Sequence, residues 1–166
     1  MELYKIKTKL FGEIEVSQTD GLTEDYGIIL EDKEMNIELQ IFENVVDSDS
    51  VKAVEDMLNH IPEMYKKAKK TILADMESNP FVKSFIEFYM DELDEYSDIF
   101  DVDSTDEVSE IMVAEKLESR GIFLSHDNNG RIECTFDFSL PEEYTDQLLV
   151  IRFNIQYEIS DITWES

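Results

Sequence analysis

Two histidines, His60 and His126, are the side chains of this sequence that could act as general bases near neutral pH. Neither is accompanied by a GxSxG, HExxH or P-loop pattern, so no nucleophile or phosphate cradle is placed beside them. The single cysteine, Cys134, alternates with polar neighbours in an apolar run, which indicates a small buried side chain and not a nucleophile. The sequence therefore identifies no catalytic residue and predicts no cofactor.

A calcium-like pattern begins at Asp101, where oxygen-bearing side chains occupy the first, third and fifth positions of Asp101–Asp106. The sixth position of such a loop requires Gly and is Asp106 here, and the twelfth requires Glu and is Met112. We predict no dedicated metal site. A divalent cation on surface carboxylates, in a cation-binding protein or a small enzyme, stays open as the alternative function.

The strongest chemical signal is acidic. No Lys or Arg occurs between Ser84 and Glu115, and residues 91–110 include ten acids in twenty positions. Helical spacing places many of these carboxylates opposite an apolar face. Two interpretations stay open: a solvated helix face, or a docking surface for a basic protein that extends from Glu87 to Glu110. The candidate partner-binding residues are Glu87, Asp91, Asp94, Glu95, Asp98, Asp101 and Asp103.

Aromatic residues along the same segment are candidate anchors for that partner. They are Tyr89, Tyr96 and Phe100. Their exposure decides whether they contact a partner or the core of the protein.

The net charge is −26, because 40 acidic residues outnumber 14 basic ones. A surface of this sign argues against binding to nucleic acids or anionic membranes, and it favours solubility, a basic protein partner or cation binding. Apolar residues make up 42% of the chain, which is enough for a core. The N-terminus has no signal-peptide pattern and no apolar run is long enough to span a membrane, so we expect a cytoplasmic protein.

The clearest local structure is a β-hairpin from Gly121 to Phe138 around the turn Asp127–Gly130, since Asn-Gly tolerates the positive φ of tight turns. Alternating apolar and polar residues predict further strands, whereas residues 18–26 resemble a loop. The other predicted strand regions are residues 2–17, 27–30, 35–42, 148–153 and 157–164, with a turn over Glu31–Glu34 and a loop over 140–146.

Between these strand regions the apolar spacing changes to steps of three and four, which is typical of helices. A helical segment over 47–76 begins at Asp47 and is kinked at Pro62. A second helix begins at the Asn79 cap and Pro80 and continues to Phe100, and a third, with a Ser104/Glu107 capping box, covers 105–118.

These elements predict an α+β fold in a single domain over residues 1–166, with β strands in 1–45, a helical segment in 50–120 and β strands in 121–166. The N- and C-terminal strands form a mostly antiparallel sheet, because both need a common core. Two to three central helices pack on one face of that sheet.

Three short motifs lie near the C-terminus: Phe136-Asp137-Phe138, the run from Thr145 to Phe153, and the final Glu165-Ser166. With LFGEIEV at Leu10–Val16, they resemble a bacterial family of uncharacterised small acidic α+β proteins. Members of that family look like the immunity and accessory proteins of toxin systems. The resemblance implies a protein-binding, immunity-like module, and it transfers no functional residues.

Overall fold

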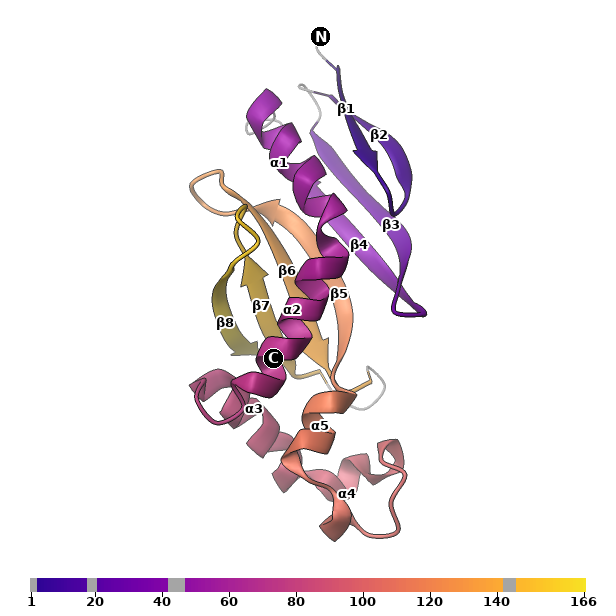
Figure 1. Ribbon diagram of the computed structural model, residues 1–166, viewed down its shortest axis with the longest axis vertical. Helices are drawn as coiled ribbons and strands as arrows, with labels where there is room; N and C mark the ends of the chain where they lie inside the picture. Colours follow the sequence, from indigo (N-terminus) through magenta and orange to yellow (C-terminus); the bar gives the residue numbers. More distant parts are fainter. Residues whose placement is uncertain (1–2, 18–20, 42–46, 142–145) are drawn as a thin grey trace.

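The computed structural model describes residues 3–17, 21–41, 47–141 and 146–166 (Figure 1). Strands come first, helices follow and strands return. The first strands are β1 (Leu3–Thr8), β2 (Gly12–Ser17), β3 (Leu22–Leu30) and β4 (Lys33–Ile41). The helices are α1 (Ser48–Asn59), α2 (Ile61–Ala74), α3 (Pro80–Asp91), α4 (Leu93–Tyr96) and α5 (Glu110–Lys116), with 3₁₀ turns η2 (Ser97–Ile99) and η3 (Thr105–Glu107). The last strands are β5 (Glu118–His126), β6 (Ile132–Ser139), β7 (Leu148–Phe153) and β8 (Ile159–Glu165).

The predicted α+β fold, with N- and C-terminal strands in one sheet, is confirmed. Six strands pair in the order β3-β4-β5-β6-β7-β8, and β1 and β2 form a separate two-stranded ribbon. All pairs are antiparallel except β4 with β5. The long helical connection between β4 and β5 makes that parallel pair feasible, because a parallel pair needs a crossover of a dozen or more residues.

The hairpin predicted around Asp127–Gly130 is β5–β6. The Asp127 Oδ1 accepts hydrogen bonds from the main-chain N–H of Asn129 at 2.8 Å and of Arg131 at 3.0 Å, and Gly130 has a φ of 76°. On the core face of β6 the apolar side chains are buried, as the alternation predicts. These side chains are Ile132, Cys134, Phe136 and Phe138.

The loop predicted over residues 18–26 is wrong for residues 22–26, because β3 already begins at Leu22. Leu22 is buried and Tyr26 half-buried, but Thr23, Glu24 and Asp25 are exposed, so this part of β3 looks loop-like in sequence. The turn after β3 is shorter than predicted, with positive φ only at Glu31 and Asp32. The predicted loop residues 18–20 and 142–145, and Phe42 at a predicted strand end, lie outside the described residues.

The helical segment predicted over 47–76 is confirmed as α1 and α2, with the break at His60. Asp47 caps α1 by accepting a hydrogen bond from the Ser50 N–H at 2.7 Å, and Pro62 lies in the first turn of α2. The two helices cross one face of the sheet in Figure 1. Tyr65 of α2 packs there, with ring centroids 6.1 Å from Phe136 and 5.9 Å from Phe138.

Two helix predictions need correction. Asn79 caps α3 as predicted, but α3 ends at Asp91 and not near Phe100. The Ser104/Glu107 capping box exists, yet it begins only the 3₁₀ turn η3. Helix α5 begins at Glu110, capped by the Ser109 hydroxyl, which accepts from the Met112 N–H at 3.3 Å.

Candidate functional site

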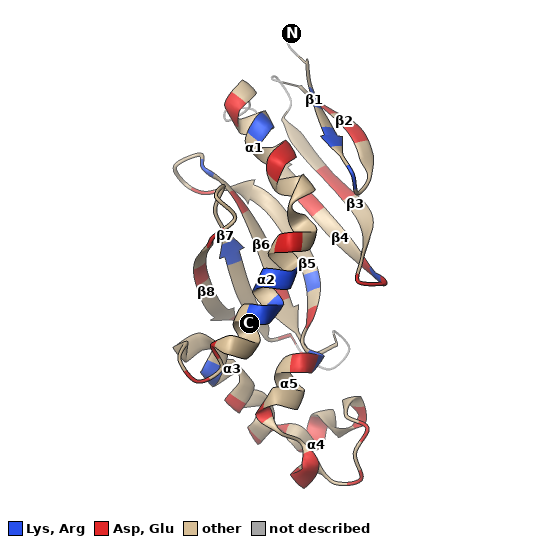
Figure 2. Cartoon of the chain, viewed as in Figure 1, with Lys and Arg blue, Asp and Glu red and all other residues tan. Residues whose placement is uncertain are grey.

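The lysine-poor segment forms one end of the molecule, which we call the acidic lobe: α3, α4, η2, η3 and α5, residues 80–116. Figure 2 shows acidic residues concentrated around α4 in this lobe. The seven predicted binding residues are distributed over it, with two on α3, two on α4, one in η2 and two in the following coil. In that order they are Glu87 and Asp91, Asp94 and Glu95, Asp98, and Asp101 and Asp103.

All seven side chains are exposed, and none forms an ion pair with a described Lys or Arg. They do not form one continuous ridge, because the chain turns at Glu92, whose N–H donates to the Tyr89 carbonyl at 3.2 Å. Two effects favour this turn over a longer helix. The turn allows the rings of Tyr89 and Tyr96 to make an edge contact with centroids 5.3 Å apart. A continuous helix would also place like charges at helical spacing, where they repel each other.

The three candidate aromatic anchors are not accessible to a partner. Tyr89, Tyr96 and Phe100 are buried, with relative exposures of 0%, 6% and 4%. Tyr89 also contacts the ring of Phe85 edge-on at 5.0 Å. These aromatics form the core of the lobe and hold its carboxylates outward.

A hollow of about 480 Å³ lies where the end of α2 meets the start of α5, and we call it the α2–α5 hollow. Exposed apolar side chains line it, since Leu73 is 42% exposed and Ile111 is 56% exposed. The seven-residue α5 buries Val113 and Ala114, and Ile111 is left at the surface. The full lining is Leu73, Ala74, Met76, Glu77, Ser109, Glu110 and Ile111.

Two carboxyl groups meet at this hollow. The pKa of Glu110 is raised, mainly by a hydrogen bond with the Glu77 side chain, with smaller contributions from partial desolvation and the charges of Glu77 and Glu87. When both groups are ionised they repel each other, and Lys83 only partly offsets that repulsion.

This arrangement suits a cationic side chain of a partner. The aliphatic stem of a Lys or Arg covers apolar surface while its charged head contacts carboxylates, and both kinds of group line this hollow. A guanidinium or ammonium group would also offset the repulsion between the two carboxylates. Neither Glu77, Leu73 nor the hollow could be found from sequence, since the lining residues belong to two segments more than thirty positions apart.

Other reactive side chains lie elsewhere. His60 stacks on Tyr157 with centroids 4.0 Å apart, and its Nδ1 lies 2.6 Å from the Asp56 carbonyl oxygen. His126 lies at the end of β5, and burial raises the pKa of the Cys134 thiol. None of the three lines the α2–α5 hollow.

The calcium-like segment forms a capping turn, in which the Glu107 carboxylate accepts from the main-chain N–H of Asp103 at 2.9 Å and of Ser104 at 3.3 Å. Among the described residues, no group of three or more His, Cys, Asp or Glu is arranged to hold a metal ion. Within the same residues, no helix has both the length and the apolar character needed to cross a membrane.

Comparison of the chain with protein-family models, with curated proteins and with solved structures finds no match. The resemblance to a bacterial family of small acidic α+β proteins, similar to the immunity and accessory proteins of toxin systems, therefore stays a prediction. The geometry of the acidic lobe and of its hollow is what supports a function.

Proposed function

We propose that this protein is a cytoplasmic protein-binding module that engages a basic partner through its acidic lobe. The α2–α5 hollow is the anchoring point of that interface. The observation that carries the proposal is that the Glu77 and Glu110 carboxyl groups line the same hollow as the exposed apolar side chains of Leu73 and Ile111.

Each part of the lobe has a separate physical task in this proposal. The exposed carboxylates steer a basic partner toward the lobe and accelerate association. The hollow then supplies apolar contact and desolvation for one Lys or Arg of the partner. Because the sequence resembles a family that is similar to immunity proteins, we propose a basic toxin as the partner.

A binding measurement with two paired variants tests the proposal. Glu77→Gln with Glu110→Gln keeps the shape of the hollow and removes both charges. The matched control, Glu133→Gln with Glu158→Gln, removes the same charge from β6 and from the turn between β7 and β8. The probe is the product of the neighbouring gene, titrated by calorimetry at low and at high salt.

We expect a complex at low salt, weaker binding at high salt, and a loss of about tenfold in affinity for the hollow variant, as for an interface charge pair. The control variant should bind within about twofold of the parent protein. Absence of a complex at low salt would overturn the proposal, and equal losses in the two variants would remove the hollow from it.

The alternative of a divalent-cation protein is tested by titration with Ca²⁺, Mg²⁺ and Zn²⁺. The Glu77–Glu110 pair supplies two carboxyl groups, whereas Ca²⁺ takes about six to eight oxygen ligands. Heat of binding at submillimolar metal, abolished in the hollow variant, would favour this alternative over protein binding.

A further inference from the structure

The outer strand β3 pairs with β4 along one edge, and its other edge has no ladder to another strand in the described part of the chain. Its turn to β4 has only two residues, so Leu30 and Lys33 form a hydrogen-bonded pair and the pairing alternates from there. The main-chain groups of every second residue therefore point away from β4. These residues are Thr23, Asp25, Gly27 and Ile29, and no hydrogen bond to their outward groups is found within the described part of the chain.

The neighbouring strand β2 has a similar edge. In its partner β1, the main-chain N–H and C=O of Lys7 point away from β2. Lys7 pairs with Glu13, and Lys5 pairs with Glu15, so the main-chain N–H and C=O of Glu13 and Glu15 point away from β1 in the same way. Among the described residues, the one bridge between β2 and β3 joins Ser17 and Gly21, where the Gly21 N–H donates to the Ser17 carbonyl at 2.9 Å.

The edge of β1 that faces away from β2 is covered by side chains of α1 instead of by another strand. The Asn59 side chain of α1 donates to the Lys7 carbonyl at 2.9 Å and accepts from the Lys9 N–H at 3.0 Å. The Glu55 carboxylate accepts from the Lys7 N–H at 2.9 Å. Side chains thus take the place of a strand at β1, and β3 has no such cover among the described residues.

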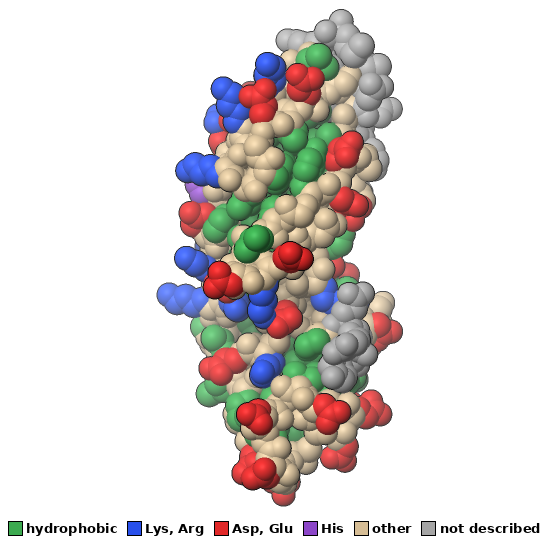
Figure 3. All heavy atoms as spheres, turned by 90° about the vertical axis from the view of Figure 1, so that its right-hand side faces the viewer, with side chains coloured by type: hydrophobic (Ala, Val, Ile, Leu, Met, Phe, Trp, Pro, Cys, Tyr) green, Lys and Arg blue, Asp and Glu red, His purple; other side chains and the backbone are tan. Residues whose placement is uncertain are grey.

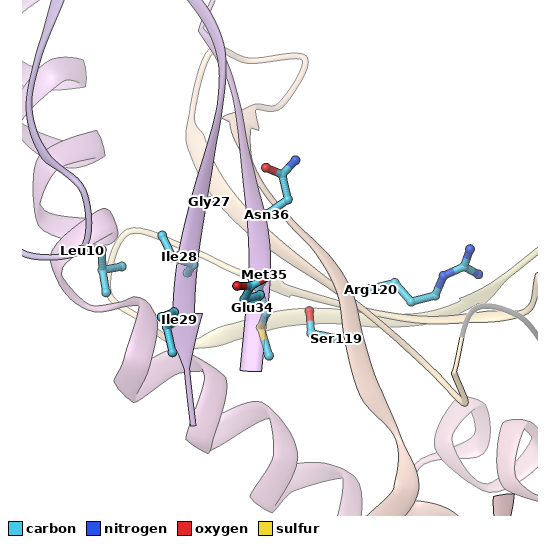
Figure 4. A pocket seen from close by; sticks show the side chains of 9 residues that line it. All are labelled: Leu10, Gly27, Ile28, Ile29, Glu34, Met35, Asn36, Ser119 and Arg120. Carbon is cyan, nitrogen blue, oxygen red and sulfur yellow. The ribbon is translucent and has the colours of Figure 1, made fainter. Parts of the chain in front are cut away.

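Apolar surface lies beside the β3 edge. Figure 3, which faces this side of the molecule, shows hydrophobic side chains in a strip along its upper half. Ile29 is 67% exposed, and Phe11 stacks on Tyr26 at 4.3 Å with both rings only partly buried. A hollow of about 750 Å³ borders the second half of β3, with Leu10 beside β3 and Arg120 on the far side, across β4 (Figure 4).

Acidic residues flank this surface. Glu13, Glu15, Glu24, Asp25 and Glu34 are exposed on β2, β3 and β4. Only Glu13 among them forms an ion pair with a described residue, Lys5, at 3.7 Å. An occupant of this edge must therefore be cationic, and a second copy of this chain would place acids against acids.

We propose that the β3 edge binds an extended, basic segment of a partner protein by strand addition. The outward main-chain groups of Asp25, Gly27 and Ile29 form the ladder, and alternate apolar side chains of the segment contact Phe11 and Tyr26 on one face of the sheet. The Lys or Arg residues between them face the carboxylates. This site is separate from the acidic lobe and does not depend on it.

The test uses a labelled peptide of about ten residues in which lysine alternates with isoleucine, the length of an ordinary strand. Two further peptides carry N-methyl groups on the main-chain nitrogens of either the lysines or the isoleucines. A strand bound at an edge directs only one of these sets toward β3. We expect one methylated peptide to lose about tenfold or more in affinity and the other to bind like the parent.

Variants of Gly27 complete the test. Gly27→Pro removes one outward N–H without touching the ladder to β4, whereas Gly27→Ala is the matched control, since an added Cβ there meets no atom within 4 Å. We expect about tenfold weaker binding for Gly27→Pro and little change for Gly27→Ala. The hollow variant Glu77→Gln with Glu110→Gln should bind the peptide normally.

Three outcomes would overturn the proposal: no measurable binding of the parent peptide, equal effects of the two methylated sets, or unchanged affinity in Gly27→Pro. Concentration-dependent dimerisation abolished by Gly27→Pro would assign the edge to a second copy instead.

Discussion

Asp137 lies on the face of the sheet that points away from the helices. In the strand pairing its neighbours are Gly121 of β5 and Val150 of β7. Partial burial raises the pKa of Asp137 to about 6, the negative charge of Glu165 adds to the shift, and Arg152 and Arg120 oppose it. The Arg152 guanidinium already forms ion pairs with the carboxylates of Asp161 and Glu165, with N–O distances of 3.2 Å in each case. The ionised Asp137 is therefore poorly compensated in the folded protein.

Asp137→Asn should change the dependence of stability on pH. A carboxyl whose folded pKa is raised stabilises the fold while it is protonated, and this contribution is lost as pH rises from about 4 to about 6. At pH 7.5 we expect the variant to be more stable by about 1 kcal/mol, less than the full linkage value because the group keeps contact with water. Urea unfolding at pH 4 and pH 7.5 measures it. An equal effect at both pH values would show that ionisation of Asp137 is not the cause.

At the scale of elements, the contact between α1 and β1 joins the N-terminal ribbon to the rest of the core. Ile6 and Val16 of the ribbon are buried in that core, and Asn59 and Glu55 satisfy the outer edge of β1. A single amide side chain thus replaces part of a strand, donating one hydrogen bond and accepting another. Without it, the Lys7 carbonyl and the Lys9 N–H must turn to water.

Asn59→Ala should destabilise the protein by about 1 to 2 kcal/mol, the magnitude for two partly exposed hydrogen bonds. Urea unfolding checks this, with an unchanged m-value if the folded and unfolded states keep their exposed areas. Lys52→Ala is the control on the same helix, because it removes only surface ion pairs with Glu55 and Asp56. Equal midpoints for Asn59→Ala and the parent protein would mean that water replaces the amide at no cost.

At the scale of the whole molecule, the charge of −26 is unevenly distributed. The acidic lobe carries the densest group of exposed carboxylates among the described residues, whereas α2 carries Lys66, Lys67, Lys69 and Lys70. Lys69 pairs with Glu31 at 3.1 Å, so part of the basic surface is already compensated within the chain. The folded state therefore bears a self-repulsion that is strongest at one end.

Salt should stabilise this protein. Screening weakens repulsion between exposed like charges, so the melting temperature should rise when NaCl increases from about 10 mM to about 200 mM. The triple variant Asp94→Asn, Glu95→Gln and Asp98→Asn should show a smaller rise, because it removes part of the repulsion in the lobe. Calorimetric melting of both proteins measures the difference. A melting temperature that falls with salt would contradict this account of the lobe.

Helix caps, helix breaks and tight turns could be predicted from the sequence, because each depends on residues within a few positions of one another. Caps at Asp47 and Asn79, the break near Pro62 and the turn before Gly130 all follow from side-chain and φ preferences. Alternation along β5 and β6 likewise predicted which face is buried. The same reasoning failed at α3, because the gain from packing Tyr96 on Tyr89 depends on tertiary contact and has no local signature.

By itself, the sequence determined the α+β class, the order of strand and helix regions, the buried face of the C-terminal strands and the acidic character of the surface. Only the tertiary structure decided the parallel pairing of β4 with β5, the meeting of Glu77 with Glu110 beside Leu73 and Ile111, and the open edge of β3. The physical reason is the range of the interactions. Propensity and periodicity act between near neighbours, whereas a site requires segments distant in the chain to be brought together by the packing of a shared core.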